Sequence, residues 1–337
     1  MQQTATVTPI PFFEAVTAFH RSAAIKAAID LDVFTLIGAG KVTAAEIAGA
    51  ARASERGIRI LCDSLTVMGF LTKAHGEYGL TDVSATFLDK RSPAFVGKAV
   101  DFLMAEAQIR GFEDLTQSVR RGGADPDGNA SIAPESEMWV KFARAMMPFI
   151  YPIAELTAAN ISLPFDGELK VLDIAAGHGI FGILAAKQYP NARIYAADWP
   201  NVLSVAKENA EKLGVVERYH TIEGSAFKSE FGTDYDLILV PNFLHHFDAA
   251  QCTAFLKKCH AALKDGGKVI TVEFVPNEDR VSPPMEAMFA LVMLAATPAG
   301  DAYTFPELKK MLEDAGFSRN EHISLDPLPS HLVVSMK

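Results

Sequence analysis

The stretch "LKVLDIAAGHGIFGILAAKQYP", residues 169–190, decides the class of fold that the sequence predicts. An apolar run leads into three glycines with G-x-G-x-x-G spacing, Gly177, Gly179 and Gly182, and a helical pattern follows them. Glycines in this arrangement let the backbone turn tightly and approach a ligand at the carboxyl end of a strand. The stretch therefore indicates a strand–loop–helix unit that holds an adenosine cofactor. The glycines alone leave open which adenosine cofactor it is.

From Leu169 onward, segments typical of strands and of helices alternate along the chain. The predicted strands are nearly continuous apolar runs, which indicates a parallel sheet covered on both faces. The last two, residues 318–325 and 331–337, are separated only by "DPLPS". A connection this short cannot hold a crossover helix, so these strands are expected to be antiparallel neighbours. The predicted fold is α/β and Rossmann-like, with a mostly parallel seven-stranded sheet that ends in an antiparallel hairpin.

The first hundred residues predict helices followed by a small hairpin. Three segments have helical periodicity, and two short β runs flank the turn-forming "HGEYG". This order is that of a winged helix, a unit that commonly binds DNA. The third helical segment offers Arg56 and Arg59 but also Asp63 on an apolar background, whereas a DNA-reading helix presents basic and polar side chains. Docking to another protein chain explains the wide apolar helical faces better.

A loop and a helical region connect these two parts. Residues 120–136 are rich in Gly, Pro and Asp and have no periodicity, which predicts a loop. The following segment is helical in pattern, and we expect breaks at Pro148 and Pro152. Met146 and Phe149 in this segment either pack in a core or form the wall of a pocket for a flat organic ligand.

Composition and charge exclude several classes of function. The chain has 337 residues, 49% of them hydrophobic, which suits two domains with full cores. A net charge of −10 argues against binding to nucleic acid or to an anionic membrane surface. The first residues lack the basic and apolar regions of a secretory signal, and the three cysteines are unpatterned. We therefore expect a protein of the reducing cytoplasm.

Two features distinguish between adenosine cofactors. Asp173 lies inside the first strand, four residues before Gly177, where a dinucleotide fingerprint has apolar residues. A carboxylate there suits a ligand with a positive ammonium and sulfonium and would repel a pyrophosphate. Asp198, at the end of the next strand, is placed to accept hydrogen bonds from ribose hydroxyls, which both cofactors carry. Because an antiparallel closing hairpin is also foreign to a dinucleotide half-domain, S-adenosylmethionine is the favoured cofactor.

Five segments in order resemble a known family. They are "VLDIAAGHG", "AADWPNV", "GSAF", "LHHF" and "GGKVITVE", and "GFLTK" with "YGLTDVSATFL" resembles its wing. The chain resembles the class I methyltransferases, and within them the caffeic-acid-type small-molecule O-methyltransferases with an N-terminal dimerisation winged helix. The resemblance covers nearly the whole chain. It implies a dimerisation domain at 1–100, connecting helices that cover the substrate at 101–165, and an S-adenosylmethionine-binding domain at 166–337.

The resemblance also implies roles for individual residues in cofactor binding. Asp198 would bind the ribose, and Trp199 and Phe227 would flank the adenine, although an interface Trp and a core Phe are the structural alternatives. Gly177 and Gly179 would lie along the carbon–sulfur chain, and Asp173 would help to fix the methionine end. Ser225 stands where the family usually has Asp, and Asn242, which follows the strand before "LHHF", completes the cofactor set.

His245 and Glu273 form the candidate catalytic pair. A phenol with a pKa near 10 would have to lose its proton to an imidazole with a pKa of about 6.5, a gap of roughly 5 kcal/mol. A carboxylate on the far ring nitrogen stabilises the imidazolium and narrows this gap. His245 and Glu273 follow neighbouring strands at the edge where ligands bind, and in the family these positions hold the base and its orienter. His246, at a family Asp position, is the competing candidate and should point elsewhere.

The sequence departs from the family before the last long helix. The family commonly has Glu-Arg-Thr there, whereas this chain has Ala302 and Tyr303, and Asp301 lies one position away. Either the acceptor is not a typical phenol or Asp301 substitutes for the missing carboxylate. In the family, the segment "PPMEAMFALVMLAATPAG" lines the acceptor pocket, and Met288 and Met293 are the pocket-facing candidates.

The sequence thus predicts a homodimeric, metal-independent enzyme that methylates a hydroxyl of a small, aromatic or polyketide-like acceptor and releases S-adenosylhomocysteine. No cluster with metal-ligand spacing lies near "LHHF". The nearest rival keeps fold and cofactor but methylates carbon or nitrogen. A winged-helix transcriptional regulator and a nicotinamide-dependent oxidoreductase are the rivals from other classes.

Overall fold

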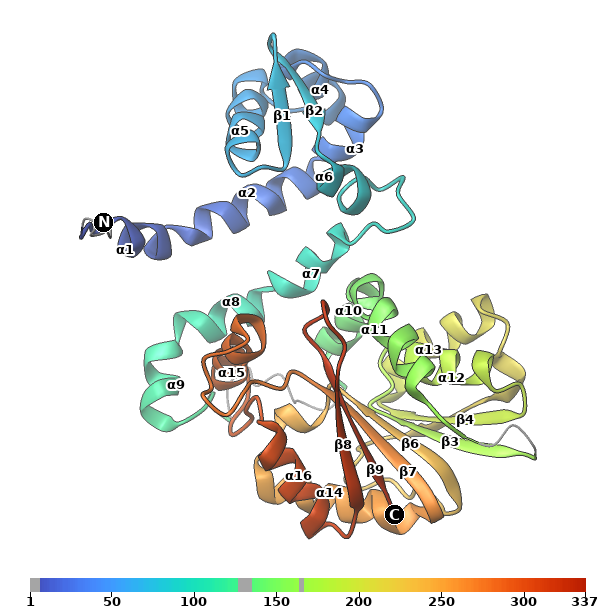
Figure 1. Cartoon of the computed structure of the whole chain (residues 1–337). Helices are drawn as coiled ribbons and strands as arrows, with labels where there is room; N and C mark the ends of the chain where they lie inside the picture. Colours follow the sequence, from blue (N-terminus) through green and yellow to red (C-terminus); the bar gives the residue numbers. More distant parts are fainter. Residues whose placement is uncertain (1–6, 127–134, 164–166) are drawn as a thin grey trace, which may run out of the picture. The chain divides into compact units, whose positions relative to one another are not determined.

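The computed structural model describes residues 7–126, 135–163 and 167–337. Its internal contacts divide the chain after Val100 into two compact units. The first unit is mainly helical and carries a two-stranded hairpin, and the second contains a seven-stranded sheet (Figure 1).

The first unit has the winged-helix order of elements. Its helices and strands are α1 (Ile10–Val16), α2 (Ala18–Asp30), α3 (Val33–Gly38), α4 (Ala44–Ala51), α5 (Glu55–Val67), β1 (Leu71–Ala74), β2 (Glu77–Leu80) and α6 (Asp82–Phe87). Thr43 begins α4 with a capping box, because its side chain accepts from the Glu46 backbone while the Glu46 carboxylate accepts from the backbone of Thr43. On α5, Arg59 pairs with Asp63 at 2.9 Å, so one of its two arginines is already engaged within the helix.

Short helices open the second unit. They are η1 (Gly97–Ala99) and α7 (Val100–Leu103), which lie at the division, then α8 (Glu106–Glu113), α9 (Leu115–Arg121), α10 (Glu137–Ala145) and α11 (Met147–Asn160). The predicted break at Pro148 is close to the boundary between α10 and α11, whereas the predicted break at Pro152 is wrong. Pro152 lies only six positions into α11, where its missing N–H costs one bond to the carbonyl of Pro148 and the helix continues. No helix in the described ranges has the length and apolar content needed to cross a membrane.

The sheet has the strand order β5-β4-β3-β6-β7-β9-β8. The strands are β3 (Leu169–Ile174), β4 (Ala192–Asp198), β5 (Tyr219–Glu223), β6 (Tyr235–Pro241), β7 (Leu263–Glu273), β8 (Ser318–Ser324) and β9 (His331–Met336). The strands β3 to β7 are parallel to one another, and β9 is antiparallel to both β7 and β8. This confirms the predicted sheet and its closing hairpin.

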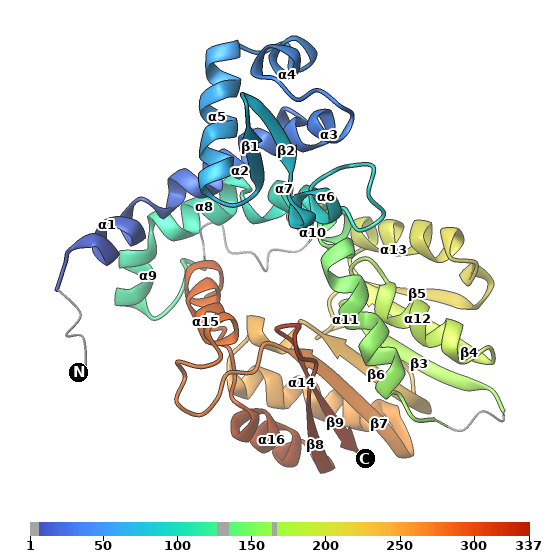
Figure 2. The same ribbon diagram turned by 45° about the horizontal axis from the view of Figure 1, so that its top comes forward.

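Helices cover both faces of the sheet (Figures 1 and 2). The helices α11, α12 (Ile180–Gln188) and α13 (Pro200–Lys212) pack together on one face. On the other face, α14 (Ala249–Ala262) and α16 (Phe305–Asp314) enclose a core that includes Phe255 and Leu308. The chain order reverses between β3 and β6, so the carboxyl ends of β3, β4, β6 and β7 meet at the edge where doubly wound folds bind their ligands.

Candidate active site

The glycine loop connects β3 to α12 at this edge. Gly177 and Gly179 have positive φ angles of 58° and 76°, which residues with a Cβ atom rarely adopt. Gly179 is also closely packed, since a Cβ built on it would lie 2.5 Å from the Tyr219 hydroxyl. Gly182 has another role: a Cβ there would lie 2.8 Å from the carboxylate of Asp173. The motif therefore fixes both the turn and the contact between α12 and β3.

Asp173 is fully buried beneath this loop. Its Oδ2 accepts a hydrogen bond of 2.9 Å from the backbone N–H of Gly182, and its Oδ1 has no hydrogen-bond partner among the described residues. Burial raises the pKa of Asp173 to about 8, against the opposing hydrogen bond from Gly182, and the charge of Asp198 adds to the shift. A cation near Oδ1 would reverse this shift, so the site suits a ligand that carries an ammonium group.

Asp198 connects the end of β4 to the glycine loop. Its Oδ2 accepts from the backbone N–H of Gly177 at 2.8 Å, and its Oδ1 accepts from that of Trp199 at 2.7 Å. Burial raises the pKa of Asp198 to about 6, although these two hydrogen bonds oppose the shift. Each carboxylate oxygen retains a lone pair, which is what recognition of two ribose hydroxyls requires.

The two aromatic candidates for adenine binding lie in different surroundings. Trp199 is the N-cap residue of α13 and packs against a cluster formed by Ala143 of α10 and Val202 and Val205 of α13. Phe227 is 37% exposed, and its other side packs on Phe247, at 4.7 Å between ring centroids. Each therefore has a structural role, and adenine binding stays a prediction for both.

A polar turn carries Phe227. The Ser225 hydroxyl accepts from the backbone N–H of Phe227 at 3.3 Å, and the Lys258 ammonium donates to the carbonyl of Ala226 at 2.9 Å. Ser225 therefore shapes the turn from the position at which the family has Asp.

His245 and Glu273 are in direct contact, as the sequence predicts. The Nδ1 atom of His245 lies 2.5 Å from Oε2 of Glu273, and the two residues are only 5% and 3% exposed. The other carboxylate oxygen, Oε1, accepts from the backbone N–H groups of Phe243 and Leu244 at 3.1 and 2.8 Å. Glu273 thus fixes both the imidazole and the turn η3 (Leu244–His246) that carries it, and Nε2 is the ring nitrogen that Glu273 leaves free.

The backbone before this turn has a special conformation. Asn242 follows β6 with a positive φ of 51°, and its N–H donates to the carbonyl of Val272 at 2.7 Å. Asn tolerates this conformation better than most residues. The bond joins the ends of β6 and β7 and so brings His245 next to Glu273.

An aromatic residue that the sequence did not single out contacts His245. Phe289 of α15 (Pro284–Ala296) meets the imidazole edge to face at 4.9 Å and stacks on Phe274 at 4.1 Å. Of the two methionines expected to face a pocket, Met293 is buried and Met288 is exposed, so they lie in different environments. In the sequence, Met285 and Phe289 are four residues apart and so share one face of a helix. Because most residues of this helix are apolar, that spacing does not show which face contacts His245.

The ring of His246 lies beside that of His245, with 4.3 Å between the ring centroids. Its ring meets that of Trp139 edge to face at 5.4 Å, and its Nδ1 is buried without a hydrogen-bond partner among the described residues. Burial, together with neighbouring His245, lowers the pKa of His246 well below the usual value. This imidazole is therefore neutral, and no carboxylate among the described residues orients it.

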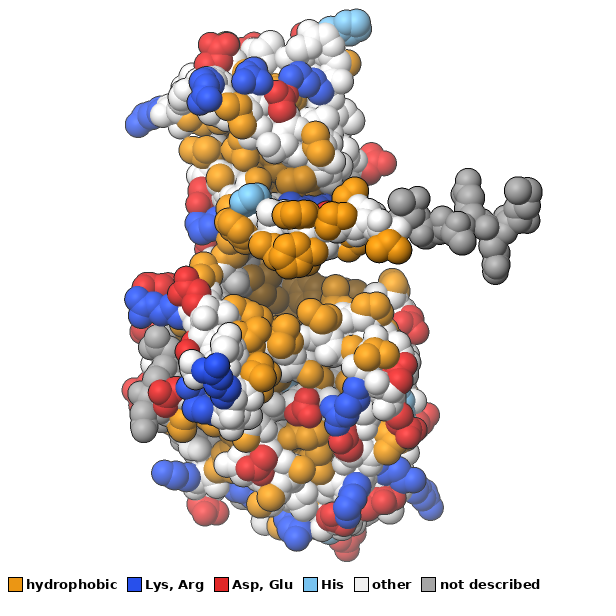
Figure 3. All heavy atoms as spheres, turned by 90° about the vertical axis from the view of Figure 1, so that its left-hand side faces the viewer, with side chains coloured by type: hydrophobic (Ala, Val, Ile, Leu, Met, Phe, Trp, Pro, Cys, Tyr) orange, Lys and Arg blue, Asp and Glu red, His pale blue; other side chains and the backbone are white. Residues whose placement is uncertain are grey.

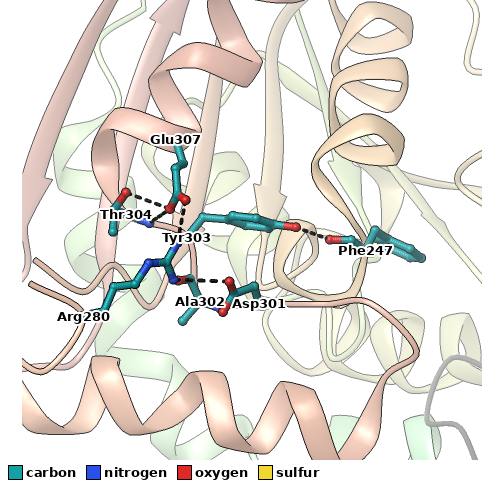
Figure 4. Close-up of polar contacts among 7 residues, drawn as sticks. All are labelled: Phe247, Arg280, Asp301, Ala302, Tyr303, Thr304 and Glu307. Atoms are coloured by element: carbon teal, nitrogen blue, oxygen red, sulfur yellow. Dashed lines mark hydrogen bonds and ion pairs between the residues drawn. The ribbon is translucent and has the colours of Figure 1, made fainter. Parts of the chain in front are cut away.

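The segment after α15 contacts the backbone of the His245 turn. The N–H of Asp301 donates to the carbonyl of His245 at 3.0 Å, and the Tyr303 hydroxyl donates to the carbonyl of Phe247 at 2.5 Å. The Asp301 carboxylate instead pairs with Arg280 at 3.2 Å (Figure 4). In this structure Asp301 therefore does not flank the imidazole, and it does not replace the carboxylate that the family has there.

His178, between the two loop glycines, was also missed. Its Nδ1 accepts from the backbone N–H of Ile180 at 3.2 Å, and its ring is stacked with that of Phe142 at 6.2 Å. Burial lowers the pKa of His178 to about 4, so the ring is neutral, and because Nδ1 accepts, its proton is on Nε2. The only sequence signal was its place in "GHG".

The two remaining candidates for an acceptor-pocket wall lie where α10 meets α11. Met146, between these helices, is buried, and Phe149 is partly buried at the start of α11. Within the described ranges, no three His, Cys, Asp or Glu side chains form a group that could hold a metal ion.

Comparisons with known proteins agree with this arrangement. The O-methyltransferase domain matches residues 135–318, and the O-methyltransferase dimerisation domain matches residues 13–90. The chain is 27% identical to 3-hydroxy-5-methyl-1-naphthoate 3-O-methyltransferase of Streptomyces sahachiroi, over 92% of this chain and 90% of that one. It is 26% identical to L-tyrosine C(3)-methyltransferase of Streptomyces lavendulae, over 87% and 82%.

A solved structure is more similar. A candidate O-methyltransferase from Nostoc punctiforme has 49% identity and a TM-score of 0.94, with 99% of this chain and 100% of that chain covered. Because the identity holds over both full chains, the likeness extends to the winged-helix unit as well as to the sheet.

Proposed function

Because the chain belongs to the S-adenosylmethionine-dependent small-molecule O-methyltransferases with an N-terminal dimerisation domain, we propose that it methylates a hydroxyl of a small aromatic or polyketide-like acceptor, with His245 as general base. The observation that carries this proposal is the buried contact of 2.5 Å between His245 and Glu273 at the ligand edge of the sheet. A base held by a carboxylate is what removal of a hydroxyl proton requires.

The residues around the glycine loop fit the cofactor. The unpartnered oxygen of Asp173 suits its ammonium group, Asp198 suits its ribose, and the tight turn at Gly177 and Gly179 would let the backbone approach its carbon–sulfur chain. Trp199 and Phe227 would contact the adenine, with Ser225 and Asn242 beside the site. When bound, S-adenosylmethionine supplies a methyl group activated by its positive sulfonium.

The chain's own residues would perform the proton transfer. With Nδ1 bonded to Glu273, the lone pair on Nε2 of His245 is the one available to a hydroxyl. As the proton arrives, the Glu273 carboxylate stabilises the positive imidazolium, and its bonds to Phe243 and Leu244 keep it in place. Phe289 covers the imidazole on its edge and helps to exclude water.

Carbon methylation is the second candidate function. The L-tyrosine C(3)-methyltransferase is nearly as similar to this chain as the naphthoate O-methyltransferase. A phenol that is deprotonated by the same base gains nucleophilic character at its ring carbons as well as at its oxygen. The position of the new methyl group therefore decides between the two functions.

Product analysis tests the proposed function. We expect purified protein to transfer a labelled methyl group from S-adenosylmethionine to hydroxylated aromatic acids such as 3-hydroxy-5-methyl-1-naphthoate, and product NMR to show an O-methyl signal. Activity should persist in EDTA, because the proposed base needs no metal. A product with the label on carbon or nitrogen, or loss of turnover in EDTA that magnesium or zinc restores, would contradict the proposal.

We further propose that residues 1–100 form a dimerisation domain, residues 101–165 connect and cover the substrate, and residues 166–337 bind the cofactor. Large apolar side chains gather on the N-terminal helices (Figure 3), where Phe12 and Phe19 are 64% and 65% exposed. Exposed apolar surface of this kind on α1 and α2 is typical of a chain–chain interface. A homodimer through these helices would cover it.

A charged substitution in these helices should separate the protomers. We expect Phe12→Glu combined with Phe19→Glu to change the protein from dimer to monomer in sedimentation velocity, because two charges would be buried in an apolar interface. Val67→Glu, at an exposed apolar residue of α5, is the control and should leave the dimer intact. A double variant that sediments as the wild type does would place the interface elsewhere.

A further inference from the structure

The segment between α15 and α16 supports the backbone of the catalytic turn. The backbone of Gly300 packs so closely against this turn that a Cβ built on it would lie 2.2 Å from the carbonyl oxygen of His245. Asp301 donates to that same carbonyl, and Tyr303 donates to the carbonyl of Phe247, which follows the turn. The position of this segment therefore affects where the imidazole of His245 lies.

Arg280 holds this segment from the opposite side (Figure 4). One guanidinium nitrogen of Arg280 contacts the carboxylate of Asp301 at 3.2 Å and the carbonyl of Ala302 at 3.4 Å. Another contacts the carboxylate of Glu307 at 2.5 Å. The second oxygen of Glu307 accepts from Thr304, which caps α16. A planar guanidinium that binds three oxygens from one segment restrains it more than a single exposed ion pair would.

The loop that carries Arg280 is itself ordered by local bonds. Arg280 has a positive φ of 57°, which is uncommon for a residue with a long side chain. Its N–H donates to the carbonyl of Asn277 at 2.9 Å, and the N–H of Asn277 donates to the carbonyl of Ser282 at 2.7 Å. This loop begins directly after Glu273, so Arg280 joins the loop that follows one member of the catalytic pair to the segment that supports the other.

We infer that Arg280 is a positioning residue for His245, which acts through Asp301, Ala302 and Glu307 and contacts neither acceptor nor cofactor. This inference rests on the proposed role of His245 as base. The inference also gives a function to residues 301–303, the segment in which this chain departs from the family. Asp301 contributes its backbone N–H to the His245 turn and its carboxylate to Arg280, instead of a carboxylate to the imidazole.

Turnover of Arg280 variants tests the inference. We expect Arg280→Ala to lower kcat about tenfold with 3-hydroxy-5-methyl-1-naphthoate as acceptor, because small displacements of a catalytic group reduce rates strongly. Binding of S-adenosylhomocysteine should stay within about twofold of wild type, because the cofactor residues lie on other loops. Arg280→Lys retains the positive charge but not the planar guanidinium with its several donors, so its kcat should lie between those of Arg280→Ala and wild type. Arg193→Ala, which removes an Arg–Glu pair of 2.9 Å near the amino end of β4, is the matched control.

An NMR measurement gives a second readout that needs no acceptor. In protein saturated with S-adenosylhomocysteine, the Nδ1 proton of His245 that is hydrogen-bonded to Glu273 should give a downfield resonance, assigned by its loss in His245→Ala. We expect this resonance to shift or broaden in Arg280→Ala and to be unchanged in Arg193→Ala.

The outcomes separate the inference from the proposed function. If Arg280→Ala retains both kcat and the downfield resonance, or loses turnover and cofactor binding together, the inference is wrong. Arg280→Lys is judged by the same criteria if Arg280→Ala does not fold. If wild type methylates no hydroxyl acceptor, the proposed function fails, and the NMR comparison alone then decides whether Arg280 positions His245.

Discussion

His245→Ala should lower kcat about 100- to 10,000-fold, which is the usual contribution of a positioned general base. The imidazole is buried, and its Nδ1 lies 2.5 Å from Glu273. Among the described residues His331 also pairs with a buried carboxylate, that of Glu286, but at the longer distance of 3.4 Å. Binding of S-adenosylhomocysteine should be unchanged within about twofold, because the base does not belong to the loop that holds the cofactor. Single-turnover kinetics and calorimetry on the same preparation measure both quantities.

His246→Ala is the matched control for this variant. It removes an adjacent, partly buried imidazole that contacts the rings of His245 and Trp139 and pairs with no carboxylate among the described residues, so the loss of kcat should be less than about tenfold. If His245→Ala retained near-wild-type turnover while His246→Ala lost it, the two roles would have to be exchanged. If both variants retained turnover, proton removal would not limit the reaction.

The contact between His245 and Glu273 could be predicted because it depends on the regular part of the fold. Apolar strands and short connections predict a parallel sheet, and residues that follow neighbouring parallel strands meet at one edge. His245 and Glu273 follow β6 and β7, so their contact follows from the strand order. The capping boxes at Thr43 and Thr304 are predictable for a similar reason, because their partners lie only three residues away.

Contacts that depend on the paths of loops could not be predicted. The sequence places Asp301 near the catalytic histidine but cannot show that its N–H faces the His245 carbonyl while its carboxylate faces Arg280. The choice of Phe289, and not Met288 or Met293, as the residue of α15 that contacts His245 depends on the rotation of an apolar helix. Pro152 is tolerated in α11 because it falls near the start of the helix, and that start depends on packing as well as on sequence.

Asp173→Asn should weaken binding of S-adenosylhomocysteine about 10- to 100-fold, the usual effect of losing one charged hydrogen bond. Asparagine can still accept the hydrogen bond from Gly182 but cannot become negative beside an ammonium group. Because the pKa of Asp173 is raised to about 8 without ligand, cofactor binding near neutral pH should also release a proton from the wild type and none from the variant. Calorimetry in buffers of different ionisation enthalpy measures this release. Asp236→Asn, at a buried aspartate that accepts from the N–H of Lys170 at 2.8 Å, should bind as the wild type does.

Asp173→Asn should also make the ligand-free protein more stable than wild type at neutral and alkaline pH. The folded-state pKa of Asp173 lies near 8 and the unfolded value near 4, so the folded protein holds the extra proton between these values. The stability that this proton contributes is fully present below about pH 4 and is lost as the pH rises through about 8. Across this pH range the contribution of Asp173 to the free energy of unfolding changes by about 5 kcal/mol.

The free energy of unfolding of Asp173→Asn should therefore exceed that of wild type by a margin that grows as the pH rises from about 5 to about 8. Urea titrations across this range measure the margin, and S-adenosylhomocysteine should reduce it, because the ligand stabilises only the wild-type carboxylate. A constant margin, together with wild-type affinity in the variant, would mean that Asp173 only packs against Gly182. The electrostatic argument for an ammonium-bearing cofactor would then lose its basis, and the assignment would rest on family membership alone.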